Sequence, residues 1–325
     1  MLDQFFLSKI MFIHESVRKN RQARISGFGA LLFIFLALSV GTAQASQALM
    51  LRDKYPDLDL GILGSAQLEP LDEKTLLIAD GIKITKAELM ETVKLQEPKL
   101  RKQLEKNLLF LLMQETTRRV LINEAKKAGI SNRSGDENQV IEELFARKSA
   151  GISVSDEEIK GFYQANREMV GETPFEQVKE VIRQYLLQDK KQQVIASYVS
   201  TLTDSIRLRI NQAWMEAQSR LALDNPVDKA RRSGKPTMVE FGATGCVPCD
   251  MMQPILDNLR KKYPGQLNVV FVHVGNEQVL AARYGIRSIP VQVFYDAKGK
   301  EAFRHVGFFP EAEVTKQLVK MGVEK

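Results

Sequence analysis

The chain has 325 residues and a mass of 36.7 kDa, which is enough for two domains. Hydrophobic residues make up 44% and charged residues 26% of it, as is usual for a soluble globular protein. Residues 1–45 hold five of the 46 basic and two of the 40 acidic residues, so the net charge of +6 falls to +3 in the rest of the chain. This balance, with no basic stripe interleaved with aromatic residues, excludes a nucleic-acid-binding protein.

The first 45 residues have the pattern of a targeting segment. Basic residues between positions 18 and 24 precede an apolar run over 25–41, and Ala43 and Ala45 then form an A-x-A cleavage pattern. The sequence therefore predicts a signal peptide, residues 1–45, that is removed after Ala45. The run also approaches the roughly 20 residues of a spanning helix, so an uncleaved inner-membrane anchor over 25–43 is the alternative. In both cases the chain that follows is exported to the periplasm.

Residues 46–75 are turn-rich, and we interpret them as a tether. The next segment, TLLIADGIKIT over 75–85, predicts a β-hairpin that turns at Asp80-Gly81, a dipeptide that readily adopts positive φ. Residues 205–210, SIRLRI, alternate as a strand does and are predicted to pair with LLIAD at 76–80.

Most of the segment between these strands has helical patterns. Three S/T-x-x-E capping boxes predict helix starts, at Thr85/Glu88, Ser155/Glu158 and Thr173/Glu176, the last with Pro174 at the first helical position. Leucines at helical spacing predict one long helix over 98–128 that stops at Gly129. Further helices are predicted over 137–148, 156–167 and 174–205.

The region 76–210 resembles the N-terminal peptide-binding domain of the periplasmic chaperone SurA and its trigger-factor-like relatives. The resemblance is carried by ADGIKITKAEL, LINEAKKAGI, VSDEEIKGFYQANRE and PFEQVKEVIRQYLLQDKKQQ. It implies a mostly α-helical module that binds unfolded or extended polypeptide in apolar grooves. The chain departs from many relatives because it has no room for a prolyl-isomerase domain between the helices. A dimerisation or spacer module without a client is the alternative.

Residues 211–224 are predicted to form a linker helix, and 225–325 a separate C-terminal domain. From Pro236 onward the pattern is a strand, a helix that begins at Cys246, a second strand, a hairpin and a closing helix. The fold class is therefore a multidomain α+β protein, in which a mostly helical domain precedes an α/β domain with a central mixed sheet flanked by helices.

The only two cysteines, Cys246 and Cys249, lie at the predicted strand-to-helix junction. The free N–H groups and the dipole of a helix N-terminus stabilise a thiolate, so Cys246 is predicted to be the reactive sulfur. Cys249 is nearly one turn further on, where it can attack a mixed disulfide formed at Cys246. A zinc site needs about four ligands and the chain has no other cysteines; a structural disulfide here closes too short a loop to constrain much.

The C-terminal residues, about 220–325, resemble the thioredoxin family. The resemblance is carried by GKPTMVEFGATGCVPCDMMQPIL, by YGIRSIPVQVFYDAKGK and by HVG. It implies that Cys246 is the nucleophile, that Cys249 is the resolving thiol and that Ile289-Pro290 is a cis peptide facing the pair. Together with Val247 and Pro248 in the motif, Ile289 and Pro290 are the predicted substrate-binding residues.

Three residues depart from the family pattern. Glu240 stands where the family often has a buried aspartate, and a buried carboxylate with a raised pKa can accept the proton of Cys249; a salt bridge pointing outward is the alternative. Gly245 replaces the usual tryptophan before the first cysteine, which removes an apolar contact surface. Asp250 stands where a lysine is common, so it opposes the helix dipole at the sulfurs.

The sequence therefore predicts an exported thiol–disulfide oxidoreductase, a protein-disulfide reductase or isomerase, with a helical polypeptide-binding module. Its expected partners are cysteine-containing or unfolded exported polypeptides and a membrane electron-donor protein, and no cofactor or metal ion is expected. The alternative is a periplasmic chaperone or assembly factor whose thioredoxin-like domain mainly binds clients.

Overall fold

The computed structural model describes residues 50–324, apart from 133–134, 166 and 168–172. Contacts divide the described residues into two compact units. The first unit comprises residues 50–116 and 207–324, and the second comprises 117–206. The predicted signal peptide and its cleavage site lie outside the described residues.

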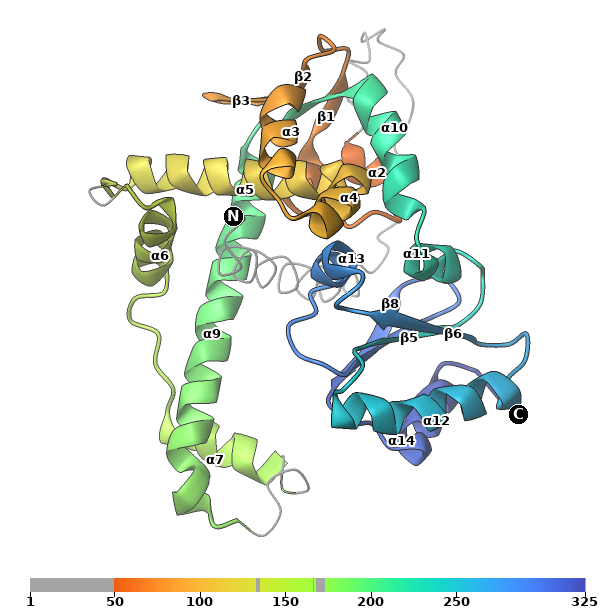
Figure 1. Ribbon diagram of the computed structural model, residues 1–325. Helices are drawn as coiled ribbons and strands as arrows, with labels where there is room; N and C mark the ends of the chain where they lie inside the picture. The colour runs from red at the N-terminus through yellow and green to blue at the C-terminus, as the bar shows by residue number, and fades with distance from the viewer. Residues whose placement is uncertain (1–49, 133–134, 166, 168–172, 325) are drawn as a thin grey trace, which may run out of the picture. The chain divides into compact units, whose positions relative to one another are not determined.

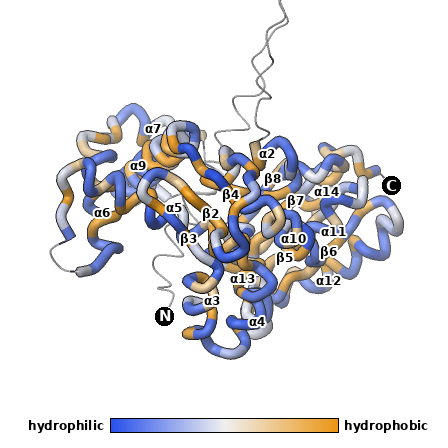
Figure 2. The backbone as a smooth tube through the Cα atoms, turned by 90° about the horizontal axis from the view of Figure 1, so that it is seen from above, coloured by the Kyte–Doolittle hydropathy of each residue, from blue (hydrophilic) through white to orange (hydrophobic). Residues whose placement is uncertain are grey.

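The first unit begins with a small four-stranded sheet in the order β1-β4-β2-β3 (Figure 1). Its strands are β1 (Gln67–Glu69), β2 (Thr75–Ala79), β3 (Ile82–Thr85) and β4 (Arg209–Asn211). The predicted hairpin is confirmed, since β2 and β3 pair in antiparallel fashion across Gly81, which has φ +70°. The predicted pairing of distant segments is also confirmed, because Ile78 lies opposite Arg209. Figure 2 shows β2 as a continuous hydrophobic segment, as expected for a strand that is almost wholly buried.

Residues 50–75 differ from the predicted tether. They contain α2 (Leu51–Lys54), a 3-10 helix (Gly61–Ser65) and strand β1. Leu51, Leu63 and Ala66 are fully buried, and the Leu51 N–H donates to the Ala66 carbonyl at 2.9 Å. The prolines and glycines of this segment form turns between short folded elements, because leucines between them are buried in the core.

The predicted helix over 98–128 is two helices in the structure. After α3 (Lys86–Lys94), α4 (Pro98–Lys106) and α5 (Leu108–Lys127) are separated at Asn107, whose backbone has φ −125° and ψ 34°. The Asn107 amide donates to the Gln103 carbonyl at 2.8 Å, a local bond that competes with the helical pattern. The periodicity of the leucines continues through this break, so hydrophobic spacing alone gives no sign of it.

The second unit contains the C-terminal part of α5, then α6 (Glu137–Lys148), α7 (Asp156–Ala165) and α9 (Phe175–Ser205). In the first unit the Thr85/Glu88 capping box forms as predicted, and in the second unit so does Ser155/Glu158. The third predicted box does not form, because α9 starts at Phe175 with Pro174 as its N-cap and no side-chain cap.

The C-terminal part of the first unit is a three-layer α/β/α domain. Its mixed sheet has the order β6-β5-β7-β8, with β5 parallel to β6 and antiparallel to β7. The strands are β5 (Thr237–Gly242), β6 (Asn268–His273), β7 (Val291–Tyr295) and β8 (Glu301–Val306). The helices are α11 (Pro226–Arg231), α12 (Val247–Lys262), α13 (Gln278–Arg283) and α14 (Glu311–Lys320), and α10 (Gln212–Leu223) precedes them, in contact with β4.

Alternate residues of β5 enter two separate cores. Met238 packs with residues of α12 and α14 on one face of the sheet, such as Leu256. Val239 and Phe241 pack with residues of α11 and α13 on the other face. Because both faces are covered, every residue of β5 is buried, and its two polar residues, Thr237 and Glu240, are fully so.

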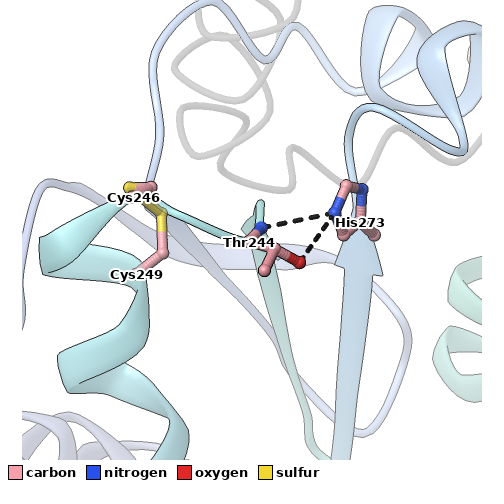
Figure 3. Close-up of a disulfide and its surroundings, with 4 residues drawn as sticks. All are labelled: Thr244, Cys246, Cys249 and His273. Atoms are coloured by element: carbon pink, nitrogen blue, oxygen red, sulfur yellow. Dashed lines mark hydrogen bonds between the residues drawn. A yellow bond between two sulfur atoms is a disulfide. The ribbon is translucent and has the colours of Figure 1, made fainter.

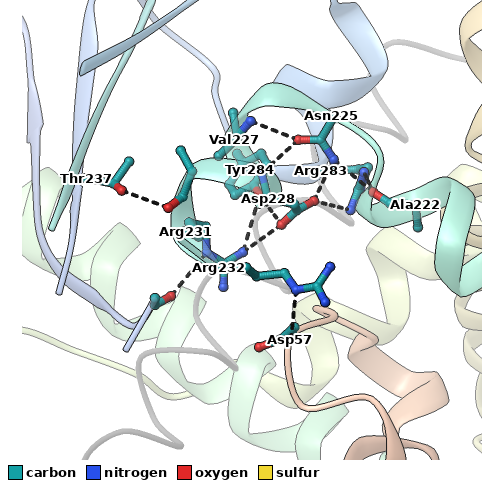
Figure 4. A network of polar contacts seen from close by, with 12 residues as sticks. Asp57, Ala222, Asn225, Val227, Asp228, Arg231, Arg232, Thr237, Arg283 and Tyr284 are labelled. Carbon is teal, nitrogen blue, oxygen red and sulfur yellow. Dashed lines mark hydrogen bonds and ion pairs between the residues drawn. The ribbon is translucent and has the colours of Figure 1, made fainter. Parts of the chain in front are cut away.

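A buried polar network joins α11, α13 and the end of α10 (Figure 4). The carboxylate of Asp228, which is 2% exposed, accepts bonds from Asn225 at 2.6 Å, Arg231 at 3.0 Å, Arg283 at 3.2 Å and the Tyr284 hydroxyl at 2.6 Å. Burial raises the pKa of Tyr284 well above its ordinary value, so this hydroxyl stays a donor. The two arginines compensate the buried charge of Asp228.

Candidate active site

The two cysteines lie where β5 ends and α12 begins, as the sequence predicts, and they form a disulfide (Figure 3). Cys246 is the N-cap of α12, with extended backbone at φ −101° and ψ 104°. Gly245 precedes it with φ +79°, a left-handed conformation that few other residues adopt without strain. The Cα atoms of Cys246 and Cys249 are 5.2 Å apart. This part of the chain therefore places two sulfurs in bonding reach at a helix N-terminus.

The two sulfurs differ in their access to solvent. Cys246 is partly exposed, whereas Cys249 is 1% exposed. The Asp250 N–H donates to the Cys246 carbonyl at 2.9 Å, which closes the first turn of α12, and the exposed Asp250 side chain lies in that turn. When the disulfide is open, the dipole of α12 favours the thiolate of Cys246, and the carboxylate of Asp250 opposes this effect. Only the outer sulfur is placed to meet another molecule.

Glu240 lies in the middle of β5 and is fully buried. It shares a face of the strand with Met238 and Gly242, which is the face covered by α12 and Cys249. Burial raises the pKa of Glu240 to about 8, and the amide of Gln292, its neighbour in β7, lowers it by a smaller amount. Among the described residues, neither Glu240 oxygen has a hydrogen bond of ordinary geometry. The alternative of an outward salt bridge is therefore wrong.

Gly242 is a residue of the site that the sequence analysis did not single out. A Cβ at this position would lie 3.1 Å from the Phe271 ring and 3.6 Å from the sulfur of Cys249. The absence of a side chain is what lets the Phe271 ring pack directly against the end of β5, beside Cys249. A glycine inside a strand pattern is the one sequence signal of such a close approach.

The Ile289–Pro290 peptide is cis and lies at the same edge of the sheet. Val291 pairs with Phe241 in antiparallel register. Pro290, the residue before Val291, therefore lies near the end of β5 from which the chain continues to the cysteines. The Pro290 carbonyl accepts the Gly307 N–H at 2.8 Å. Ile289 and Pro248 are partly exposed and Val247 is 72% exposed, while Pro290 itself is buried. The structure therefore gathers the four predicted substrate-binding residues at one edge of the domain.

His273 is a second residue that the sequence analysis missed. It ends β6, and its Nε2 atom lies 3.3 Å from the backbone nitrogen and 3.2 Å from the hydroxyl of Thr244 (Figure 3). Thr244 stands two residues before Cys246. No spacing rule relates positions 244 and 273, since only the pairing of β5 with β6 brings them together.

Within the described part of the chain, no group of three or more His, Cys, Asp or Glu side chains is arranged to hold a metal ion. The two sulfurs are bonded to each other. The chemistry that this arrangement can perform is thiol–disulfide exchange, in which the partly exposed cysteine exchanges partners and the buried one closes the bond.

The fold and the site define a protein of thiol–disulfide chemistry, and comparison with known proteins identifies its family. A family model described as a thioredoxin-like domain matches residues 223–322. Thioredoxin 1 of Nostoc sp. is 34% identical over 88 residues, which are 27% of this chain and 81% of that protein. The chain therefore belongs to the thioredoxin family through its C-terminal domain, and the predicted thioredoxin resemblance is confirmed.

Two further matches cover the same domain. The thiol:disulfide interchange protein TxlA homolog of Synechocystis sp. is 36% identical over 98 residues, which are 30% of this chain and 53% of that protein. The solved structure of the thioredoxin NaTrxh from Nicotiana alata is 28% identical and covers 29% of this chain and 80% of that chain, with a TM-score of 0.27. The sequence matches support a redox role for this domain.

Proposed function

We propose that the protein is an exported thiol–disulfide oxidoreductase that acts mainly as a protein-disulfide reductase, with its helical part binding the polypeptide client. One observation carries the proposal: Cys246 is the N-cap residue of α12 and is partly exposed, while Cys249 is buried behind it. This asymmetry gives the two sulfurs different tasks, since one meets the client and the other releases it.

The first step starts from the reduced pair. The Cys246 thiolate attacks one sulfur of a client disulfide, which forms a mixed disulfide and expels the other client sulfur as a thiolate. Val247, which is exposed, and Ile289, which is partly exposed, give an extended client chain an apolar edge beside the reacting sulfurs.

The second step releases the client. Cys249 loses its proton, its thiolate attacks the Cys246 sulfur, and the second client sulfur leaves as a thiolate. Two electrons have then passed to the client, and the protein holds the Cys246–Cys249 disulfide seen in the structure. We assign the proton of Cys249 to Glu240, because its carboxyl lies on the same face of β5 and its raised pKa of about 8 suits a proton acceptor near neutral pH.

A reductase outside the cytoplasm needs a source of electrons. A dithiol on a membrane electron-donor protein would attack the Cys246–Cys249 disulfide and restore the two thiols, so that the donor becomes oxidised. Isomerase action needs no net electron transfer: a second client thiolate attacks the mixed disulfide, a new client disulfide forms, and the Cys246 thiolate leaves.

Export is part of the proposal and is based on the basic and apolar pattern of residues 1–45. Among the residues that the structure describes, no helix is both long and apolar enough to cross a membrane. Either a cleaved signal peptide or an anchor over 25–43 would place the redox site in the periplasm.

The helical second unit is proposed to bind clients through an apolar surface on α7 and α9. In the apolar cluster at this surface Val154, Ile159 and Ile182 are buried, and six further apolar residues around them are partly buried: Phe162, Tyr163, Phe175, Val178, Leu186 and Leu187. Val181 is 70% and Tyr185 is 58% exposed, and their spacing places them on one side of α9. A binding unit joined to a redox domain raises the local concentration of client disulfides.

The exposed apolar side of α9 also favours a second candidate function. The protein would then be a chaperone or assembly factor, and its thioredoxin-like domain would mainly bind clients. Under this alternative the sulfurs are dispensable for the main activity.

Reduction of insulin disulfides, followed with the wild type and with Cys246→Ser, tests the main proposal. We expect the wild type to precipitate insulin in the presence of dithiothreitol faster than the reductant alone, and the variant to lose this acceleration. A wild type without acceleration would contradict reductase function.

Suppression of client aggregation separates the two candidates. We expect Val181→Asp with Tyr185→Asp to weaken it, and Ser197→Asp, at an exposed position of α9, to leave it unchanged. If the wild type does not reduce insulin, and Cys246→Ser suppresses client aggregation as well as the wild type does, the chaperone alternative would be established.

A further inference from the structure

We propose that His273 is a positioning residue of the redox site, which holds the loop that presents Cys246 by accepting the backbone N–H of Thr244. The inference rests on the proposed function, because it concerns how the loop before the nucleophile is fixed. The Thr244 nitrogen lies 3.3 Å from His273 Nε2, and its hydroxyl oxygen lies 3.2 Å from the same atom (Figure 3).

The pairing of β5 with β6 brings His273 close to Thr244. His273 pairs with Gly242 in the parallel register of β5 and β6, so its side chain stands at the edge where β5 gives way to the cysteine loop. Thr244 and Gly245 are both exposed, and Gly245 has positive φ. Among the described residues, the three-residue loop between Gly242 and Cys246 therefore has few constraints other than the bond to His273.

The direction of the bond determines the form of the imidazole. A backbone N–H can only donate, so Nε2 must carry a lone pair, and the ring proton of the neutral form is on Nδ1. An imidazolium would place two N–H groups against each other and break the anchor. Nδ1 is buried and has no hydrogen-bond partner among the described residues, so it does not draw the ring into a different bond.

The imidazole is held on its other sides as well. A side chain at Gly275 would lie 3.2 Å from His273 Cε1, so the glycine lets the chain pack directly against the ring. The backbone N–H groups of Asn276 and Glu277 donate to the His273 carbonyl at 2.9 and 3.0 Å. The Phe271 ring meets the imidazole edge-on, with centroids 6.5 Å apart. The acceptor nitrogen is thereby kept aimed at Thr244.

A pair of amide variants tests the assignment. Gln reaches about as far as Nε2 and can accept the Thr244 N–H, whereas Asn reaches only about as far as Nδ1. In the reduced full-length protein, we expect His273→Asn to raise the exchange rate of the Thr244 amide hydrogen and to slow alkylation of Cys246 at pH 7 by about fivefold, the equivalent of one lost hydrogen bond. We expect His273→Gln to restore both to within about twofold. His305→Gln is the control, because His305 lies in β8 with its Nε2 atom 3.1 Å from the Phe308 carbonyl oxygen, and we expect it to change neither rate.

Two results would overturn the inference. One is equal amide exchange and equal alkylation in the wild type, His273→Asn and His273→Gln. The other, which needs no variant to fold, is a long-range ¹H–¹⁵N spectrum of the wild type that shows Nε2 protonated at pH 7. Amide exchange and alkylation do not require a client, so an inactive wild type in the insulin assay would contradict the proposed function and leave this test intact.

Discussion

The side-chain amide of Gln103 in α4 caps the N-terminus of α13. Its oxygen accepts the Val279 N–H at 3.0 Å, and its nitrogen donates to the Asn276 carbonyl at 2.8 Å. The N-cap residue Glu277 makes no side-chain cap of its own. A residue 176 positions earlier in the chain therefore completes a helix of the thioredoxin-like domain.

Gln103→Ala is expected to lower the free energy of unfolding by about 1–2 kcal/mol, because it removes a helix cap and leaves the Asn276 carbonyl without this donor. Urea denaturation of the full chain measures this loss. Lys99→Ala is the matched control, since Lys99 makes a single exposed bond to Asn276, and we expect a change below about 0.5 kcal/mol. Equal effects of the two variants would contradict the capping role.

Glu240 should make stability depend on pH. Its pKa is about 8 in the fold and near 4.5 when unfolded, so the folded state holds more protons between these values. The contribution of Glu240 to the free energy of unfolding is therefore greatest below about pH 4.5. It falls as the pH rises toward 8, by up to about 1.4 kcal/mol per pH unit. Glu240→Gln should flatten this slope and raise stability at pH 8. Urea titrations from pH 5 to 8 check it, and a slope unchanged by the variant would contradict the buried carboxyl.

Glu240→Gln should also slow release of the client. If the carboxyl accepts the proton of Cys249, the mixed disulfide at Cys246 forms at the normal rate but persists, with a release rate lower by about 10²-fold or more. Acid quenching followed by mass spectrometry measures its accumulation with a small disulfide substrate. Release as fast as in the wild type would show that solvent takes the proton.

Gly242→Ala should disturb the site by packing alone. The added methyl would lie 3.1 Å from the Phe271 ring and press on it, and overpacking of this kind costs about 1–3 kcal/mol. Gly161→Ala in α7 is the control, because no atom lies within 4 Å of its added methyl, and helix propensity predicts a gain of about 0.5–1 kcal/mol. Thermal denaturation of both variants provides the comparison, and a neutral Gly242→Ala would refute the close approach.

Local patterns predicted much of the fold. The Asp80-Gly81 turn, the capping boxes at Thr85 and Ser155 and the strand-to-helix junction at Cys246 are each encoded within a few residues, and the structure has all of them. Two predicted features failed for different reasons. The segment after Met50 folds because its leucines are buried in a core that the local pattern does not show, and the helix break at Asn107 comes with a side-chain bond to the Gln103 carbonyl that hydrophobic spacing does not record.

The same distinction holds for the site. The spacing of the two cysteines and the proline near them predicted the sulfur chemistry, because a helix turn sets the distance between positions 246 and 249. His273 and Gln103 could not be found in this way. Their partners, Thr244 and Val279, are set by strand register and by the packing of α4, which no short motif records.

The reactivity of Cys246 toward iodoacetamide, measured across a pH series with the pair reduced and Cys249→Ser as a reference, tests the central claim most directly. Free cysteine has a pKa of about 8.5. The account predicts that Cys246 reacts with an inflection below that value and faster than free cysteine at neutral pH, since it is the N-cap residue of α12 and is partly exposed. An inflection at or above the ordinary value, with no gain in rate, would contradict it.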